Sequence, residues 1–188
     1  MIDNPYCAKV NLPSVLANEE ILYRSEKTPY IVNISEINQE AVKCLTDRGI
    51  GIESIEVFKL GINNRRWVIH TDGYPEWFEG QYSGDQAKIN WVYGNLDCEM
   101  KWYKAHPNIT KETMYNNVGP YAVYRDEDVD EVFSMNIGKS AIIQSGIPHT
   151  VFNNTDVERY CVSVHLNYPG FSRTPFVLIK HLLSDFII

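Results

Sequence analysis

The chain has 188 residues, of which 44% are hydrophobic and 22% charged, and its 24 acidic and 17 basic side chains give a formal net charge of −7 at pH 7. A chain of this length suits a single domain with a substantial core. The acidic balance, with a pI near 5.2, argues against a nucleic-acid or anionic-membrane binder, because such surfaces are bound through an excess of lysine and arginine.

The four cysteines are far apart and form no CxxC pair, so the sequence predicts neither a structural zinc site nor a redox motif. The chain begins without a basic segment followed by an apolar one, and no apolar run reaches the length of a membrane span. These observations predict a cytoplasmic protein with reduced thiols.

Residues 1–54 are expected to form an arm and a bracing helix. Residues 1–30 are polar and interrupted by prolines, which is typical of a loop over the surface. A strand is expected at 30–34, and Ser35 is a suitable N-cap for a helix that ends at Gly49. Nothing in this segment suggests catalysis.

Two predicted strands lead to the first candidate site residues. A strand at 52–60 is followed by a turn at 61–64, and the next strand begins at Arg66 and reaches His70. Side chains alternate along a strand, so His70 and Asp72 project to the same face. An imidazole and a carboxylate then converge, and a metal site would need a further ligand from elsewhere in the chain.

The loop at 73–85 is rich in aromatic, glycine and acidic residues. Loops that leave a metal site often contact the substrate, so Tyr74 and Trp77 are assigned to substrate binding. The alternative is that aromatic side chains such as Trp77 and Phe78 only cap the mouth of a barrel.

A strand at 87–93 carries Lys88 and Asn90 on one face and apolar residues, including Trp91, on the other. If the Lys88 and Asn90 face points inward, these side chains can meet a carboxylate. If it points outward, they are solvated. Trp91 is assigned to substrate binding.

The following segments complete the predicted core. Strands are expected at 98–104 and 140–144, the segment 105–130 is expected to be a loop with a solvated acidic cluster, and the tight connection at 145–148 delivers His149. Short strands separated by turns, without a βαβ pattern, predict a mainly β (α+β) fold: an antiparallel double-stranded β-helix of the jelly-roll or cupin type with flanking helices.

His149 is the best candidate for the third metal ligand. Two histidines and one carboxylate on one face of an ion leave three positions open, as in non-haem Fe(II) oxygenases. Ten residues later, a strictly alternating strand places Arg159, Cys161, Ser163 and His165 on one face. An arginine inside a barrel needs an anion, and its planar guanidinium suits a carboxylate. His165 is expected to be a hydrogen-bonded histidine near the strand end.

The C-terminal segment, 169–188, is expected to be helical. Thr174 and Pro175 look like the cap and first turn of a helix at 176–186. Its apolar residues would either cover the outer sheet or form a homodimer contact. The chain is thus predicted to be one domain with its jelly-roll core at 55–168.

The order His70-x-Asp72, His149 and Arg159 resembles that of the 2-oxoglutarate- and Fe(II)-dependent dioxygenases. The similarity is greatest to small aspartyl/asparaginyl-, prolyl- and phytanoyl-hydroxylase-like enzymes of bacteria and phages. The resemblance implies that the two histidines and the aspartate bind Fe(II), and that Arg159 pairs with the distal carboxylate of 2-oxoglutarate. O2 would be the second co-substrate.

The resemblance also implies where further co-substrate contacts lie. Many family members have a serine or threonine two residues after the arginine, whereas this chain has Cys161, and the nearest hydroxyl on the same face belongs to Ser163. We therefore expect Ser163, Asn90 and Lys88 to contact the co-substrate.

The function implied is hydroxylation of a protein residue or a small molecule, with a peptide or a small molecule as the partner. Three alternatives are open: a cupin-type metal enzyme that does not use 2-oxoglutarate, a jelly-roll binding protein without a metal, and a phage-associated protein that has kept the fold and lost activity. The first has no need for Arg159.

Overall fold

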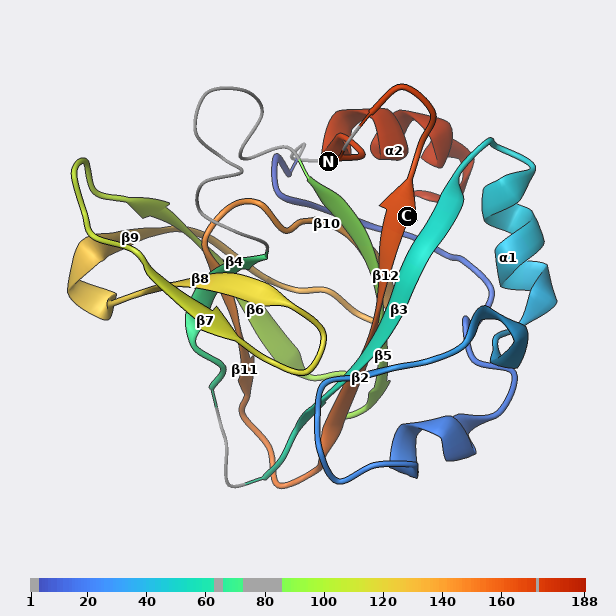
Figure 1. Cartoon of the computed structure of the whole chain (residues 1–188), viewed down its shortest axis with the longest axis horizontal. Helices are drawn as coiled ribbons and strands as arrows, with labels where there is room; N and C mark the ends of the chain where they lie inside the picture. The colour runs from blue at the N-terminus through green and yellow to red at the C-terminus, as the bar shows by residue number, and fades with distance from the viewer. Residues whose placement is uncertain (1–3, 63–65, 73–85, 172) are drawn as a thin grey trace.

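The computed structural model describes residues 4–62, 66–72, 86–171 and 173–188. Their main feature is a pair of antiparallel six-stranded sheets that pack against each other (Figure 1). This mostly β architecture is the predicted jelly-roll or cupin-like sandwich.

The first sheet has the order β1 (Cys7–Lys9), β10 (Ser140–Gln144), β5 (Ala87–Gly94), β12 (Arg159–Asn167), β3 (Gly51–Leu60) and β2 (Tyr30–Ile31). The second has the order β7 (Glu112–Tyr115), β8 (Pro120–Tyr124), β4 (Ile69–Asp72), β11 (His149–Asn153), β6 (Cys98–Ala105) and β9 (Val129–Asn136). The helices are α1 (Gln39–Thr46) and α2 (Phe176–Leu182), with 3-10 turns η1 (Glu19–Tyr23), η2 (Ile34–Glu36), η4 (Asp126–Asp128) and η5 (Ser184–Phe186). Across the described residues, no helix combines the length and the apolar character that a bilayer crossing requires.

The first sheet is covered on its outer face and polar on much of its inner face. Tyr160, Val162 and Val164 of β12 belong to a large apolar cluster that also contains residues of the N-terminal arm and both helices. Helix α1 packs against β3, and α2 packs against β10 and β5 (Figure 1). Between the sheets, a smaller apolar cluster joins Val92 of β5 to Trp102 of β6. The alternation predicted for β12 therefore separates an apolar outer face from a polar inner one.

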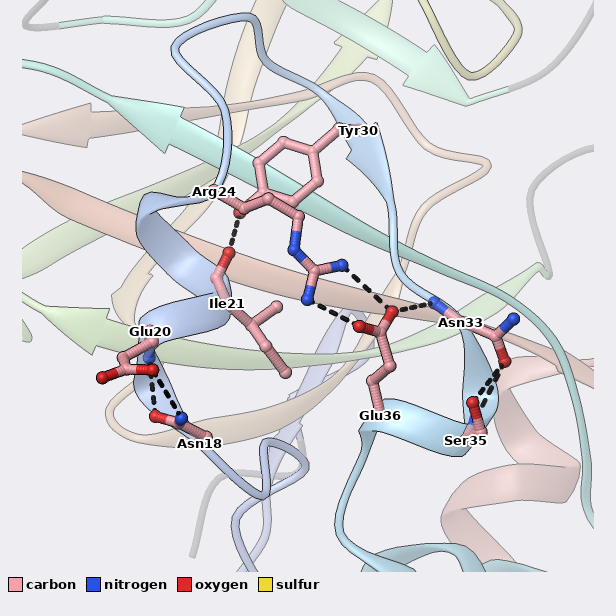
Figure 2. A network of polar contacts seen from close by, with 8 residues as sticks. All are labelled: Asn18, Glu20, Ile21, Arg24, Tyr30, Asn33, Ser35 and Glu36. Carbon is pink, nitrogen blue, oxygen red and sulfur yellow. Dashed lines mark hydrogen bonds and ion pairs between the residues drawn. The ribbon is translucent and has the colours of Figure 1, made fainter.

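The N-terminal arm has more regular structure than the sequence predicted. Strand β1 pairs with β10 at the sheet edge, and Cys7 and Ala8 are buried there. Arg24, at the end of η1, donates two hydrogen bonds of 3.0 and 2.6 Å to the carboxylate of Glu36 (Figure 2). The arm is thus part of the folded domain, because its scattered apolar residues reach the core between the prolines.

The helix predicted after Ser35 begins later. The backbone N–H of Ser35 donates to the side chain of Asn33, and the carboxylate of Glu36 accepts from the N–H of Asn33 (Figure 2). This capping box belongs to the 3-10 turn η2. Helix α1 instead starts after Asn38, whose side chain accepts a hydrogen bond from the N–H of Glu40.

The predicted loop at 105–130 contains the hairpin β7–β8. The side-chain oxygen of Asn116 accepts hydrogen bonds from the N–H groups of Val118 and Gly119, at 2.9 and 3.0 Å, and closes the turn. Gly119 and Pro120 suggested a break in structure, but proline is tolerated as the first residue of a strand. Strand β7 is mostly exposed, so its sequence lacks the alternation that would have revealed it.

Helix α2 covers the first sheet. Phe176, Ile179 and the following Leu183 are buried, whereas Val177 is 68% exposed. Thr174 does not cap the helix, since its hydroxyl donates to a backbone carbonyl of β12. The helix therefore contributes its buried side chains to the core. A homodimer contact through this helix stays a prediction.

Gly94 closes β5 opposite Arg159 with a backbone φ of +73°, and a Cβ at this position would overlap the carbonyl oxygen of Glu158. We expect Gly94→Ala to lower the free energy of unfolding by at least about 2 kcal/mol, because the clash adds to the cost of the left-handed backbone. Gly138→Ala is the matched control: its φ is +68° with no atom within 4 Å, so it should cost only about 1 kcal/mol. Urea unfolding measures the free energy of unfolding of both variants. Equal losses of stability would contradict the proposed clash at Gly94.

Candidate metal centre

The three candidate metal ligands meet in the second sheet. His70 of β4 and His149 of β11 are directly paired across the two strands, and their ring centroids are 4.4 Å apart. Asp72 lies two residues beyond His70 on the same face, with its Oδ1 3.7 Å from Nε2 of His70. One ligand atom from each of the three residues lies within 4.8 Å of the others. Strand pairing thus brings together residues that are 79 positions apart in the sequence (149 − 70).

Both imidazoles are oriented by backbone carbonyls. Nδ1 of His70 lies 2.9 Å from the carbonyl oxygen of Val68, and Nδ1 of His149 lies 2.8 Å from that of Ile147. A carbonyl oxygen only accepts, so Nδ1 must carry the proton in each ring. Nε2 is then unprotonated and free to bind a metal. The sequence could not reveal these partners, since any residue supplies a backbone carbonyl.

The protonation states suit metal binding. Burial, together with the smaller effect of the neighbouring His70, lowers the pKa of His149 to about 4. Burial also lowers the pKa of His70. For Asp72, burial would raise the pKa, but Lys88 and the nearby histidines hold it well below its usual range. At neutral pH the group therefore consists of two neutral imidazoles and one carboxylate.

Three further polar side chains form a buried group beside Asp72. Nζ of Lys88 lies 3.1 Å from Oδ2 of Asp72 and 4.0 Å from Oε2 of Glu56. Nε2 of His165 lies 3.0 Å from Oε1 of Glu56. His165 therefore lies within ion-pair distance of a carboxylate, but its Nε2 makes no hydrogen bond among the described residues, so its expected role as a hydrogen-bonded histidine stays a prediction. Glu56 was not singled out from the sequence, although its position between the buried Ile55 and Val57 marks it as inward-facing.

The cross-strand register explains why polar side chains gather on the inner face of the first sheet. Lys88 of β5 pairs with His165 of β12, and Asn90 pairs with Ser163. Further along β12, Arg159 lies opposite Gly94, which has no side chain to cover the guanidinium. The open question about Lys88 and Asn90 is therefore answered: both point inward.

An inner cavity of about 70 Å³ lies between this polar face and the metal group. The lining includes all three candidate metal ligands together with Lys88, Asn90, Arg159, Cys161 and Ser163. The proposed co-substrate residues and the proposed metal ligands therefore face the same space.

Arg159 is buried in this cavity, and no carboxylate of the described residues is paired with it. It is 4% exposed, and its Nε has no hydrogen-bond partner among the described residues. Its guanidinium lies near the thiols of Cys98 and Cys161, where burial raises the pKa of both and Arg159 opposes the increase. Within the described lining, Asp72 is the one carboxylate, and Lys88 already contacts it.

A second cavity, here called the outer cavity, has a volume of about 280 Å³ and also reaches the metal group, since His70 and Asp72 are among its lining residues. It shares Phe58, Trp67, His70, Asp72 and Lys88 with the inner cavity. Its other polar lining residues include Glu53, Ser54, Gln86, Asn116, Tyr121 and Arg173. The candidate ligands thus lie where a smaller cavity meets a larger one.

The structure corrects one of the three substrate assignments. Trp91 lies on the outer face of β5, is 3% exposed within the outer apolar cluster, and donates a hydrogen bond of 2.9 Å from Nε1 to the carbonyl oxygen of Pro13. It faces away from the metal group because it alternates with Lys88 and Asn90. Tyr74 and Trp77 lie outside the described residues, so their assignment stays a prediction.

Comparisons with known proteins do not identify a family for this chain. No protein-family model matches the chain, and no curated protein sequence matches it. One similar solved structure is a "Non-heme monooxygenase, ThoJ-Ni complex", with 14% identity and a TM-score of 0.39. The match covers 72% of this chain and 51% of that protein, so this chain spans about half the length of that enzyme. A similarity this low does not indicate a shared activity.

The donor set fits a divalent transition metal. Imidazole suits iron, copper, nickel and zinc, and two histidines with one carboxylate are typical of open non-haem iron sites. Two ligand atoms at right angles, each about 2.1 Å from an ion, are about 3 Å apart. The three ligand atoms, which lie within 4.8 Å of one another, would move closer together to bind one ion. The group could therefore hold one ion and leave positions open toward both cavities.

Proposed function

We propose that the protein is an Fe(II)- and 2-oxoglutarate-dependent oxygenase that hydroxylates a small molecule or a peptide residue. The observation that carries the proposal is that Arg159, which is buried and has no carboxylate partner among the described residues, lies in the same cavity as the His70, Asp72 and His149 group. An iron ion held by these three residues would supply O2 activation coupled to decarboxylation of the co-substrate to succinate.

Charge balance in the cavities favours a dianionic co-substrate. Among the described lining residues of the two cavities, the negative charges of Glu53, Glu56 and Asp72 are balanced by the positive charges of Lys88, Arg159 and Arg173. The remaining charged lining residue, Lys59, is paired with Glu158 outside the lining. A divalent ion would add two uncompensated positive charges in a partly buried space, which is unfavourable. A dicarboxylate restores neutrality, with one end at the ion and the other at Arg159.

The inner polar face offers the remaining contacts to such an anion. Asn90 is 7% exposed and its Oδ1 has no hydrogen-bond partner among the described residues, while Ser163 is opposite it on β12. A buried polar atom without a partner costs free energy unless a ligand or water satisfies it. In this proposal, the hydroxyl of Ser163 contacts the co-substrate carboxylate, because Cys161 has no hydroxyl to do so.

The proposal is tested by succinate formation from 2-oxoglutarate in anaerobically purified protein to which Fe(II), ascorbate and O2 are added. We expect slow turnover in the wild type that depends on Fe(II), and none in His70→Ala, which removes a ligand. His106→Ala is the control, since His106 is a partly exposed residue paired with Asp130. Turnover that survives in His70→Ala would contradict the proposed centre.

A further inference from the structure

Lys88 is the feature of the site that the proposed function does not explain. It is 3% exposed, yet its Nζ lies 3.1 Å from Oδ2 of Asp72, a candidate metal ligand. A cation this close to a metal site opposes metal binding by electrostatic repulsion. Such a residue is unfavourable there unless it controls how the carboxylate binds.

The two carboxylate oxygens of Asp72 have different neighbours. Oδ1 faces the histidines, 3.7 Å from Nε2 of His70, whereas Oδ2 faces Lys88. A carboxylate can bind a metal through one oxygen or through both. With Oδ2 held by an ammonium group, only Oδ1 remains available to the ion.

Lys88 is itself held in position. Glu56 of β3 is 5% exposed and lies 4.0 Å from Nζ of Lys88, and His165 contacts the other oxygen of Glu56 at 3.0 Å. These residues lie on three neighbouring strands, β5, β3 and β12, so their backbone positions are fixed by the sheet. If the lysine turned to solvent, the buried carboxylate of Glu56 would lose its ammonium partner and keep only the contact with His165, which is costly.

We propose that Lys88 is a positioning residue of the metal centre, which restricts Asp72 to a single ligand atom, and that Glu56 and His165 hold Lys88 in this place. This inference rests on the proposed metal centre. A six-coordinate ion with two imidazoles and one carboxylate oxygen keeps three open positions, which a bidentate co-substrate and O2 require. A bidentate Asp72 would leave only two. Lys88 thus acts on a metal ligand, in contrast to the co-substrate contact expected from the sequence.

The test uses Mn(II) as a probe, because it prefers oxygen and nitrogen ligands and its exchangeable water molecules can be counted by water-proton relaxation. In the absence of 2-oxoglutarate we expect three exchangeable waters in the wild type and two in Lys88→Met, where Oδ2 is released to the ion. Mn(II) affinity should also rise roughly tenfold in Lys88→Met, because a nearby positive charge is lost.

Two companion variants separate this role from others. Lys88→Arg keeps the charge and should keep three waters. Lys88→Met with Glu56→Gln removes both charges of the pair, so it should fold even if the single variant does not, and it should show two waters. Three waters in this double variant would overturn the inference and leave Lys88 with a purely structural or co-substrate role. Absence of Mn(II) binding in the folded wild type would instead contradict the proposed function.

Discussion

Replacing His149 with alanine is expected to weaken the binding of divalent metal by roughly a hundredfold or more, because the ion loses one of three protein ligands. His149 is 5% exposed. Because its Nδ1 is held by a backbone carbonyl, Nε2 is the nitrogen whose lone pair is available to the metal. A hundredfold change corresponds to about 2.8 kcal/mol. Equilibrium dialysis against Co(II), followed by metal analysis, measures the affinity directly.

Two controls accompany the His149→Ala variant. Urea unfolding without metal reports whether the smaller side chain destabilises the fold, and metal-induced stabilisation should appear in the wild type but not in the variant. His106→Ala removes an imidazole outside the group and should leave the affinity unchanged. Full metal affinity in folded His149→Ala would exclude this residue as a ligand.

Replacing Arg159 with leucine is expected to lower the affinity for 2-oxoglutarate roughly a hundredfold while metal affinity changes little. Loss of one partner of a buried, charge-assisted contact costs about 2–5 kcal/mol. Arg159→Lys should give a smaller loss, because lysine keeps the charge but not the planar pair of donors. Calorimetric titration of the anaerobic Fe(II)-loaded variants with 2-oxoglutarate gives these affinities.

Arg173→Leu is the comparison for Arg159, because Arg173 lies in the outer cavity and donates a hydrogen bond to Gln86. We expect the affinity for 2-oxoglutarate to be nearly unchanged in Arg173→Leu. Loss of affinity in Arg173→Leu together with an unaffected Arg159→Leu would place the distal carboxylate in the outer cavity and contradict the assignment.

The core strands could be predicted because each has a buried face with a clear period. In β12, apolar Tyr160, Val162 and Val164 alternate with polar or small residues, and the structure places the two sets on opposite faces. The hairpin at 112–124 escaped prediction because an exposed strand such as β7 needs no apolar face. Its pairing with β8 depends on a turn closed by Asn116 that the sequence pattern did not single out.

The site could be predicted only in part. His70 and Asp72 follow from local alternation, but their meeting with His149 depends on the pairing of β4 with β11, a long-range contact that no local pattern specifies. The resemblance to a known order of residues supplied that link. The direction of Lys88 and its contact with Asp72 depend on packing between two sheets, which explains why it was left open.

Trp91 was assigned to the site from the sequence, but the structure places it away from the metal group. The pattern correctly placed it on the face opposite Lys88 and Asn90, and these two residues were considered for an inward position. Assigning all three to the site was therefore inconsistent, and the structure places Trp91 under the N-terminal arm, where it bonds to Pro13. An aromatic residue on a strand with two buried faces more often belongs to the core.

Calorimetric titration of the anaerobic wild-type protein with 2-oxoglutarate, with and without Fe(II), tests whether the metal group and Arg159 bind one co-substrate together. We expect one equivalent of 2-oxoglutarate to bind per chain when Fe(II) is present, and binding to be at least tenfold weaker without the ion, because one end of the dianion needs the metal and the other needs Arg159. If the Fe(II)-loaded protein binds no 2-oxoglutarate, the co-substrate assignment is wrong and a metal enzyme of another kind becomes the better account. Binding that is equally tight without Fe(II) would show that the anion site and the His70, Asp72 and His149 group do not work together.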